Sequence, residues 1–191
     1  MKKAFILSIG LVIVFGSGFV ASHFWSQSSY DGHSTHMASM EVDMHDEGDM
    51  PMLNGKDTTA DEVVDLKSMF QNHKDITRSV ELLPNGIKTT TESPDENLRS
   101  ALVNHVASMI TRVEQGQDPQ IPIQSSTLDI LFQKGSEIIT EIETTDFGVS
   151  VIQTSGNPEV VAALQKHALE VSDLAARGMQ AVHEQMMGHH N

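Results

Sequence analysis

The sequence contains no cysteine among its 191 residues, and aromatic residues make up only 5% of it, with one Trp and one Tyr. The absence of cysteine excludes disulfides, thiolate zinc sites, cysteine nucleophiles and iron–sulfur clusters held by cysteine. Basic residues are also scarce, 12 against 26 acidic ones, so the formal net charge is -14. A general nucleic-acid binder needs a basic face for phosphate, and this balance argues against that class of partner.

Common enzyme motifs are missing as well. The chain has no nucleophile elbow, Walker loop, HExxH, CxxCH or Rossmann fingerprint. We therefore favour a protein that is not an enzyme, although a metal site for hydrolysis or redox chemistry needs no linear motif. The side chains left for metal binding are thioether, imidazole and carboxylate groups.

Methionine and histidine are abundant, with 11 Met and 10 His. Eight of these 21 residues lie between positions 33 and 52 and six more between 179 and 190, where even spreading would place fewer than four in total. Composition therefore points to the two ends of the chain.

The N-terminus has the order of an export signal. Lys2 and Lys3 precede an uncharged, mostly apolar run over 4–21. Residues 4–25 are long enough for a retained inner-membrane anchor, whereas the small residues at 20–22 suit a cleavage site. Residues 1–25 are thus a signal peptide or a membrane anchor, and we expect the remainder in a bacterial periplasm.

Residues 26–57 form a predicted disordered segment, acidic and rich in Met and His. Residues 31–62 hold nine acids and one base, and Gly and Pro interrupt any apolar period. Thioether selects Cu(I), while imidazole suits copper, nickel and zinc, so a flexible strand carrying both can wrap a metal ion. The alternative is a solvated tether whose Met are incidental. The candidate ligands here are His33, His36, Met37, Met40, Met44, His45, Met50 and Met52.

The leader over residues 1–52, an apolar run followed by a His/Met/Asp-rich stretch, resembles that of periplasmic adaptor proteins from copper and silver efflux systems. The resemblance implies copper and a metal-transport or efflux partner in the cell envelope. The rest of the chain lacks the coiled-coil hairpin and lipoyl pattern of those adaptors.

The central chain contains an internal duplication. An offset of 62 aligns residues 66–116 with 128–178 without a gap, and 11 of the 51 positions are identical. Chance predicts about three identities. We interpret residues 58–120 and 121–180 as two α-β-β-α repeats that form one pseudo-twofold α+β domain with a four-stranded antiparallel sheet.

Local signals place the elements of each repeat. In the first, Thr59 and Glu62 form a capping box before a helix, and strands over 75–83 and 86–92 flank a Pro-Asn-Gly turn. Ser93 is the expected N-cap of a long helix that runs to about residue 115 and stops at Gly116. In the second, we expect a helix at 127–134, strands at 137–145 and 148–154, and a helix from Pro158.

Several polar residues of the repeats are candidates for a site inside the domain. His105 and His167 occupy equivalent positions on apolar helix stripes, where they are either metal or haem ligands or core histidines. His73 and Met109 would complete a soft site, with Arg78 and Arg112 as anion contacts. The alternative for the arginines is a surface position or an ion pair with Glu81 or Glu114.

The pattern His73, Ile76, Arg78, Thr91-Glu92-Ser93, His105-Val106, Met109 and Arg112 resembles an uncharacterised family of exported bacterial proteins. The second-repeat pattern Gly148-Val149, Thr154-Ser155, His167-Ala168 and Gly178-Met179 is similar to that family too. The resemblance covers about residues 64–183 and implies a shared domain without a known activity.

The tail, residues 181–191, is again rich in Met and His. With Met179, it offers His183, Met186 and Met187 at helical spacing as metal ligands, or as a Met-rich helix end that packs on the domain. Taken together, these patterns favour an exported copper-binding protein for storage, delivery or resistance. The alternatives are a haem-binding or redox protein that uses the paired histidines, and a membrane-tethered interaction or sensory domain.

Overall fold

The computed structural model describes residues 50–188. These residues form five α-helices, three short 3-10 helices and one four-stranded antiparallel sheet, so the predicted α+β class is confirmed. The predicted N-terminal helix and most of the predicted acidic segment lie outside this range. In chain order the elements are η1 (Pro51–Leu53), α1 (Ala60–Gln71), η2 (His73–Asp75), β1 (Thr77–Leu83), β2 (Gly86–Glu92), α2 (Glu96–Gln115), α3 (Thr127–Gln133), η3 (Gly135–Glu137), β3 (Ile138–Thr144), β4 (Gly148–Ser155), α4 (Pro158–Arg177) and α5 (Met179–Gly188).

The sheet has the strand order β1-β2-β4-β3, and every neighbouring pair is antiparallel. The two hairpins β1-β2 and β3-β4 meet through β2 and β4 at its centre. In this central pair Thr89 lies opposite Val151, and Gly86 lies opposite Thr154. A Cβ atom at Gly86 would come within 1.9 Å of the Gln153 carbonyl oxygen, so glycine is required for this close approach.

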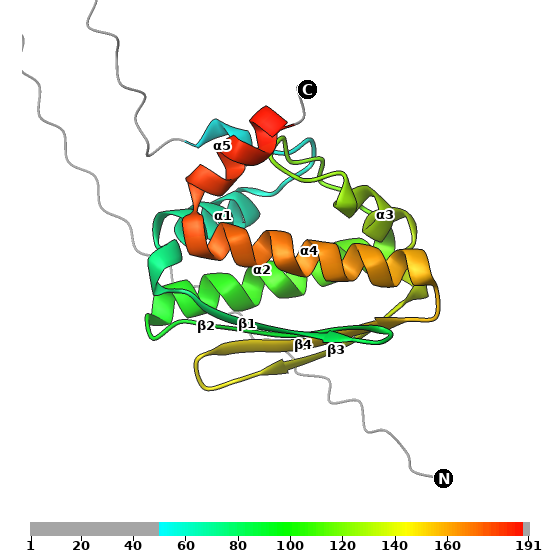
Figure 1. Ribbon diagram of the computed structural model, residues 1–191. Helices are drawn as coiled ribbons and strands as arrows, with labels where there is room; N and C mark the ends of the chain where they lie inside the picture. Colours follow the sequence, from blue (N-terminus) through cyan, green and yellow to red (C-terminus); the bar gives the residue numbers. More distant parts are fainter. Residues whose placement is uncertain (1–49, 189–191) are drawn as a thin grey trace, which may run out of the picture. The chain divides into compact units, whose positions relative to one another are not determined.

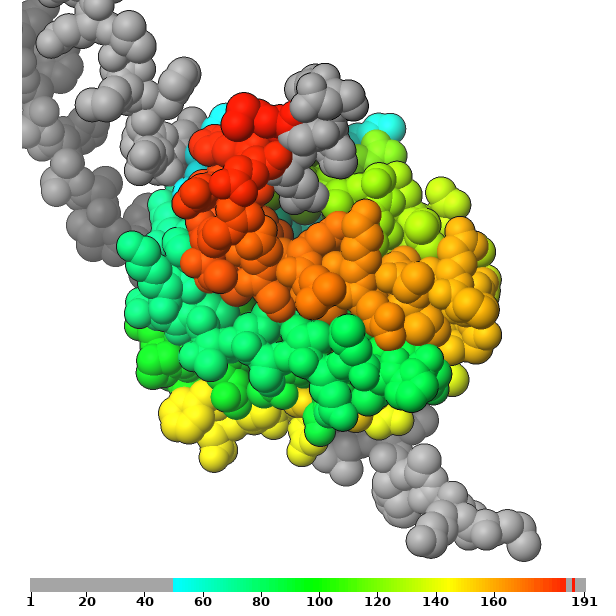
Figure 2. Space-filling model, in the orientation of Figure 1, coloured from blue at the N-terminus to red at the C-terminus, as the bar shows by residue number. Residues whose placement is uncertain are grey.

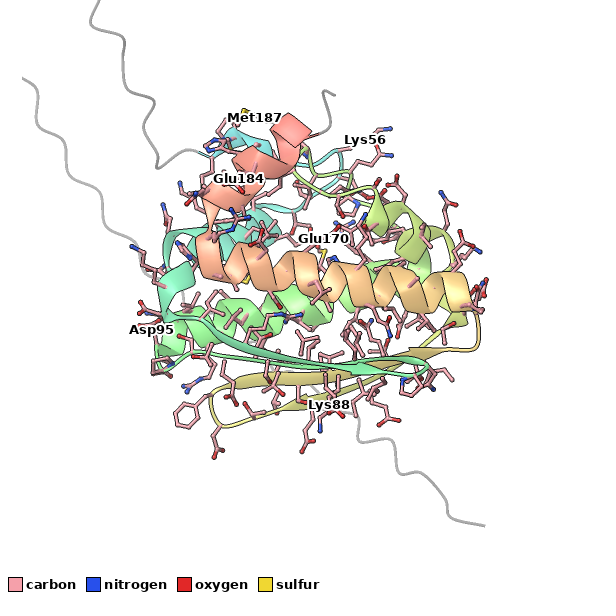
Figure 3. All side chains as sticks on the ribbon, in the orientation of Figure 1. Lys56, Lys88, Asp95, Glu170, Glu184 and Met187 are labelled. Carbon is pink, nitrogen blue, oxygen red and sulfur yellow. The ribbon has the colours of Figure 1, made fainter. Side chains whose placement is uncertain are left out.

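All five helices lie on one face of the sheet, with α2 and α4 as the layer next to it (Figure 1). The helix α4 packs mainly on β1 and β2, and α2 packs mainly on β4, so each long helix contacts strands from the other half of the sequence. Figure 2 shows α4 directly above the β1 edge of the sheet. None of the described helices lies on the opposite face, and Lys88 points away from the helices there (Figure 3). The two halves therefore share one interlocked core.

The helix ends follow local signals, with one correction. The capping box is confirmed, because Glu62 N donates to Thr59 Oγ1 at 3.2 Å and Thr59 N donates to Glu62 Oε2 at 2.9 Å. For α2, however, the N-cap is Asp95, whose Oδ1 accepts from Leu98 N at 2.8 Å. The prediction of Ser93 as the N-cap was wrong by two residues. Ser and Asp are both favourable N-cap residues, so the sequence alone did not decide between them.

Two clusters of buried apolar side chains hold the layers together. The larger one joins the sheet to α3 and α4, and the smaller one joins η1 to α1. Leu53 is fully buried in the smaller cluster, and Met50 packs against it. Residues 50–57, the end of the segment predicted to be disordered, therefore pack on the domain. The buried members are Ile87, Leu131, Val160, Ala163, Leu164 and Ala168 in the larger cluster and Leu53, Leu66 and Ile121 in the smaller one.

Candidate ligand cavity

A cavity of about 300 Å³, partly open to solvent, lies between the inner face of the sheet, the helices α1, α2, α3 and α4, and the 119–125 loop. Most of its lining is aliphatic or aromatic. Protein cores contain few voids larger than a water molecule, and small-molecule sites start at roughly this volume. The polar or charged side chains on the lining are His73, Arg78, Thr89, Thr91, His105, Gln124, Ser125, Gln153, His167 and Glu170.

The fold brings most of the candidate residues of the domain to this cavity. His73, His105, Met109 and His167 all line it, and so does Arg78. They come from η2, β1, α2 and α4. Whether any of them holds a metal ion or haem stays a prediction.

Arg78 is the one arginine on the cavity lining. Its Nη1 donates to Thr91 Oγ1 at 2.5 Å, directly across the β1-β2 pair, while its buried Nε has no hydrogen-bond partner. No carboxylate of the described residues forms an ion pair with it. Burial lowers the pKa of Arg78 to about 10, so the guanidinium remains charged at neutral pH.

His105 faces the cavity from α2 and is neutral at pH 7. Burial lowers its pKa to about 4, the charge of Glu62 works in the opposite direction, and a positive charge on His167 would lower the pKa further. Its buried Nδ1 has no partner. His167 lines the same cavity from α4.

Glu170 was missed by the sequence reasoning. It lies on α4 three residues after His167 and beside the start of α3 (Figure 3). Its carboxylate accepts from Ser125 Oγ at 2.7 Å and Thr127 Oγ1 at 3.0 Å, and His167 Nδ1 lies 3.9 Å away. Burial alone would raise the pKa of Glu170, but interactions with His167, Ser125 and Thr127 lower it to about 2. The i, i+3 spacing from His167 was a signal available in the sequence.

His73 has a structural partner at the end of α4. Its ring nitrogen Nδ1 lies 3.1 Å from the Ala175 carbonyl oxygen. A Cβ atom on Gly178, which has φ +56, would come within 2.6 Å of the His73 ring. The ring therefore occupies space that only a glycine at 178 leaves open.

Arg112 lies away from the cavity lining and forms a buried ion pair with Glu62. Its Nε donates to Glu62 Oε1 at 2.6 Å and its Nη2 to Oε2 at 2.9 Å. Further donations go to Asp57 Oδ1 at 3.2 Å and to the backbone oxygens of Asp57 and Gln117. The partners suggested from the sequence, Glu81 and Glu114, are not the ones observed.

The Arg112–Glu62 pair also changes the carboxyl group. The pKa of Glu62 falls to about 2, chiefly through the hydrogen bond from Arg112 and against the effect of burial, with Ser108 and the Thr59 backbone assisting. These hydrogen bonds tie α1, α2 and residue 57 together. Arg112 therefore serves the packing of α1 on α2 in this structure.

The predicted ligands near the chain ends are only partly described. Met50 packs against the smaller core cluster, and Met52 and Met179 are half-buried, whereas His183 and Met187 are exposed on α5 (Figure 3). Residues 50–188 contain no group of three or more His, Asp or Glu arranged to hold a metal ion. The other predicted ligands lie outside the described side chains: His33, His36, Met37, Met40, Met44, His45 and Met186.

Comparison of the chain with protein-family models, with curated proteins and with solved structures found no match. Among the described helices, none is both long enough and apolar enough to cross a membrane. The predicted anchor at residues 4–25 lies outside the described range.

Proposed function

We propose that this chain is an exported binding protein whose central domain holds a small, largely apolar molecule in the cavity between the sheet and the helices. The observation that carries this proposal is the cavity itself, about 300 Å³ with a mainly apolar lining. Side chains that line such a space lack packing partners on one side, which costs stability while the space is empty. A ligand that fills this space would supply the missing contacts and stabilise the folded domain.

The cavity volume sets the size of that ligand. A cavity of about 150 Å³ accommodates benzene, so 300 Å³ accommodates about 12 non-hydrogen atoms. Haem, with about 43 such atoms, exceeds this room unless the helices move apart. The cavity therefore favours a small ligand over the haem alternative. Absorption spectra after haem addition test this: a Soret band that disappears in His105→Ala would support haem instead.

The direct test measures the melting temperature of the full-length protein with increasing 1-octanol, a neutral probe that fits the cavity. We expect a concentration-dependent rise in melting temperature, because a ligand that binds only the folded state stabilises it. Val106→Trp, which narrows the cavity, should abolish the rise. Val64→Trp, the same change at a position 63% exposed on α1, should retain it. An unchanged response of Val106→Trp would overturn the proposal.

We further propose that the two halves of the domain are copies of one repeat. The sheet register supports this, because under the 62-residue offset Thr89 pairs with its own equivalent, Val151. Equivalent backbone bonds also recur: Ser93 N donates to the Phe147 oxygen at 2.8 Å, and Ser155 N donates to the Asn85 oxygen at 2.9 Å. Both patterns suit a twofold axis through the centre of the sheet. The similarity to exported bacterial proteins is in line with such a shared domain.

Copper binding is our second candidate function, and it rests on the Met and His residues at the chain ends. His183 and Met187 are exposed one turn apart on α5, where a soft ion has access to both. The acidic segment would attract the cation, and an efflux or transport partner would receive it. This function places the protein in the periplasm, either released or anchored in the inner membrane through residues 4–25.

Copper analysis tests this second function. We expect the full chain to bind more than one Cu(I), and deletion of residues 31–49 to remove most of it. The deletion stops before residue 50 because Leu53 is part of the core. His183→Ala with Met187→Ala should lower the remaining copper, whereas Gln180→Ala, a nearby exposed substitution, should not. Full copper retention by the deletion variant would remove the leading role of the acidic segment.

A further inference from the structure

Two buried side-chain nitrogen atoms of the described residues have no hydrogen-bond partner, Arg78 Nε and His105 Nδ1. Both residues line the same cavity. Buried polar atoms in native proteins are nearly always paired, and an unpaired one needs an explanation. Their coincidence on one cavity points to a polar group of the ligand.

The charge of the cavity indicates the kind of group. Arg78 has one neutral partner, Thr91, and no ion pair among the described residues. Arg78 is half-buried, and a partly desolvated cation without a counter-ion gains from an anion in contact with it. Nε and Nη2 of an arginine form a fork that matches the two oxygens of a carboxylate.

The other half of the sheet shows that the fold does not need this charge. Thr140 and Gln153 are the equivalents of Arg78 and Thr91 under the 62-residue offset and also lie opposite each other. There Gln153 Nε2 donates to Thr140 Oγ1 at 3.4 Å, so two neutral groups satisfy each other. The same cross-strand position is therefore filled without a charge in one half and with an uncompensated charge in the other.

We infer that the ligand is a monocarboxylate with an apolar body of roughly eight to ten carbons, whose carboxylate binds Arg78 and whose body lies among the aliphatic side chains of the cavity. His105, whose Nδ1 is also buried without a partner, is a second polar residue of the lining. This inference rests on the proposed binding function of the cavity. A monoanion fits better than a dianion, because the cavity offers one permanent cation and already carries the Glu170 carboxylate.

Calorimetric titration of the full-length protein with three probes of equal chain length tests the inference: octanoate, 1-octanol and octyl phosphate. Octanoate has about ten non-hydrogen atoms and fits the estimated room. We expect octanoate to bind about tenfold more tightly than 1-octanol, the gain of a charge-assisted hydrogen bond, and also more tightly than octyl phosphate.

Arg78→Met should remove the preference, with octanoate weakened at least about tenfold and 1-octanol unchanged or tighter. Arg78→Lys keeps the charge without the fork and should retain part of the preference. The matched control is Arg99→Met on α2, whose guanidinium donates to the Asp146 carbonyl oxygen and lies off the cavity lining. It should bind all three probes like the unmodified protein.

Each other result has a distinct meaning. Equal binding of octanoate and 1-octanol, or the same octanoate affinity in Arg78→Met, would overturn the carboxylate inference and leave the cavity function standing. Tighter binding of octyl phosphate would also overturn it, in favour of a dianion. Binding of none of the probes would contradict both the inference and the proposed function.

Discussion

The two halves of the domain, residues 58–120 and 121–180, have the same order of elements but different polar groups at matching positions. His73, Arg78 and Arg112 of the first half correspond under the 62-residue offset to Gly135, Thr140 and Leu174 of the second. These three residues have different surroundings in the structure. The His73 ring contacts the Ala175 carbonyl oxygen near the end of α4, Arg112 on α2 pairs with Glu62 on α1, and Arg78 lines the cavity. Of the two arginines, only Arg78 has no ion pair within residues 50–188.

The largest effect is expected from Arg112→Leu, which gives the first half the residue of the second. It leaves the Glu62 carboxylate buried without its cation, which costs about 3–5 kcal/mol in unfolding free energy. Urea unfolding at pH 7 measures this, and adding Glu62→Gln should recover part of the loss. Arg177→Leu, which breaks exposed ion pairs with Asp173 and Glu184, should cost much less, because solvent screens exposed pairs. Equal losses for both arginines would contradict the structural role of Arg112.

Gly135→Ala tests the position in the second half that corresponds to His73 of the first half. A Cβ atom there would lie 1.9 Å from the Val113 carbonyl oxygen, so η3 or α2 must shift. We expect a loss of about 2–3 kcal/mol, again from urea unfolding. Gly156→Ala is the control, because its Cβ atom would meet nothing within 4 Å. A neutral Gly135→Ala would show that the two helices are not in such close contact.

The pH dependence of stability tests the burial of His105. Its pKa of about 4 in the fold lies below the value of about 6.5 for an exposed histidine, so the unfolded chain binds the proton more tightly between these values. The contribution of neutral His105 to the unfolding free energy is fully present above pH 6.5 and is lost as pH falls toward 4. At pH 5 the loss is about 2 kcal/mol. His105→Gln should flatten the unfolding free energy between pH 7 and 5.

Glu62 and Glu170 titrate at lower pH than His105, so they change the unfolding free energy little between pH 7 and 5. The pKa values of Glu62 and Glu170 are about 2 in the fold, so their contribution is present above about pH 4.5 and is lost as pH falls below it. Stability curves of His105→Gln and the unmodified protein that stay parallel between pH 7 and 5 would contradict the buried, neutral histidine.

The smallest effect, and the only stabilising one, is expected from Arg78→Met. Without ligand, removing a half-buried charge that has no ion pair within residues 50–188 should raise the unfolding free energy by about 1 kcal/mol, because a binding residue is retained at a cost in stability. Thermal and urea unfolding of the ligand-free protein measure it, with Arg99→Met as the surface control. A clear loss of stability would mean that Arg78 mainly supports the fold.

Much of the fold was predictable because its signals are local. The capping box of Thr59 and Glu62, the turn before Gly86 and the stop at Gly116 each depend on residues within a few positions, and the structure confirms them. Ser93 and Asp95 are both favourable N-cap residues only two positions apart, and the sequence alone did not decide which of them caps α2. Residues 50–57 were predicted as disordered from their composition, yet Leu53 finds its partners at Leu66 and Ile121, which no local pattern shows.

Most residues of the candidate site were predictable from the sequence, but the contacts between them were not. Equivalent helix positions brought attention to His105 and His167, and loss of symmetry brought attention to Arg78 and Arg112. No local pattern shows that Arg112 pairs with Glu62, 50 positions earlier on the neighbouring helix, while Arg78 has no ion pair within residues 50–188. Glu170 escaped notice because its partners Ser125 and Thr127 lie more than 40 positions away.

The sequence by itself determined the elements, their order and the enrichment of Met and His at the chain ends, since helix caps, turns and composition are properties of neighbouring residues. Only the tertiary structure decided which polar groups meet. It crossed each long helix over strands from the other half and formed a cavity of about 300 Å³. Within residues 50–188 it paired Arg112 with Glu62 and left Arg78 without an ion pair. The physical reason is that burial and charge pairing depend on contacts between distant segments, which form only when the two halves pack together.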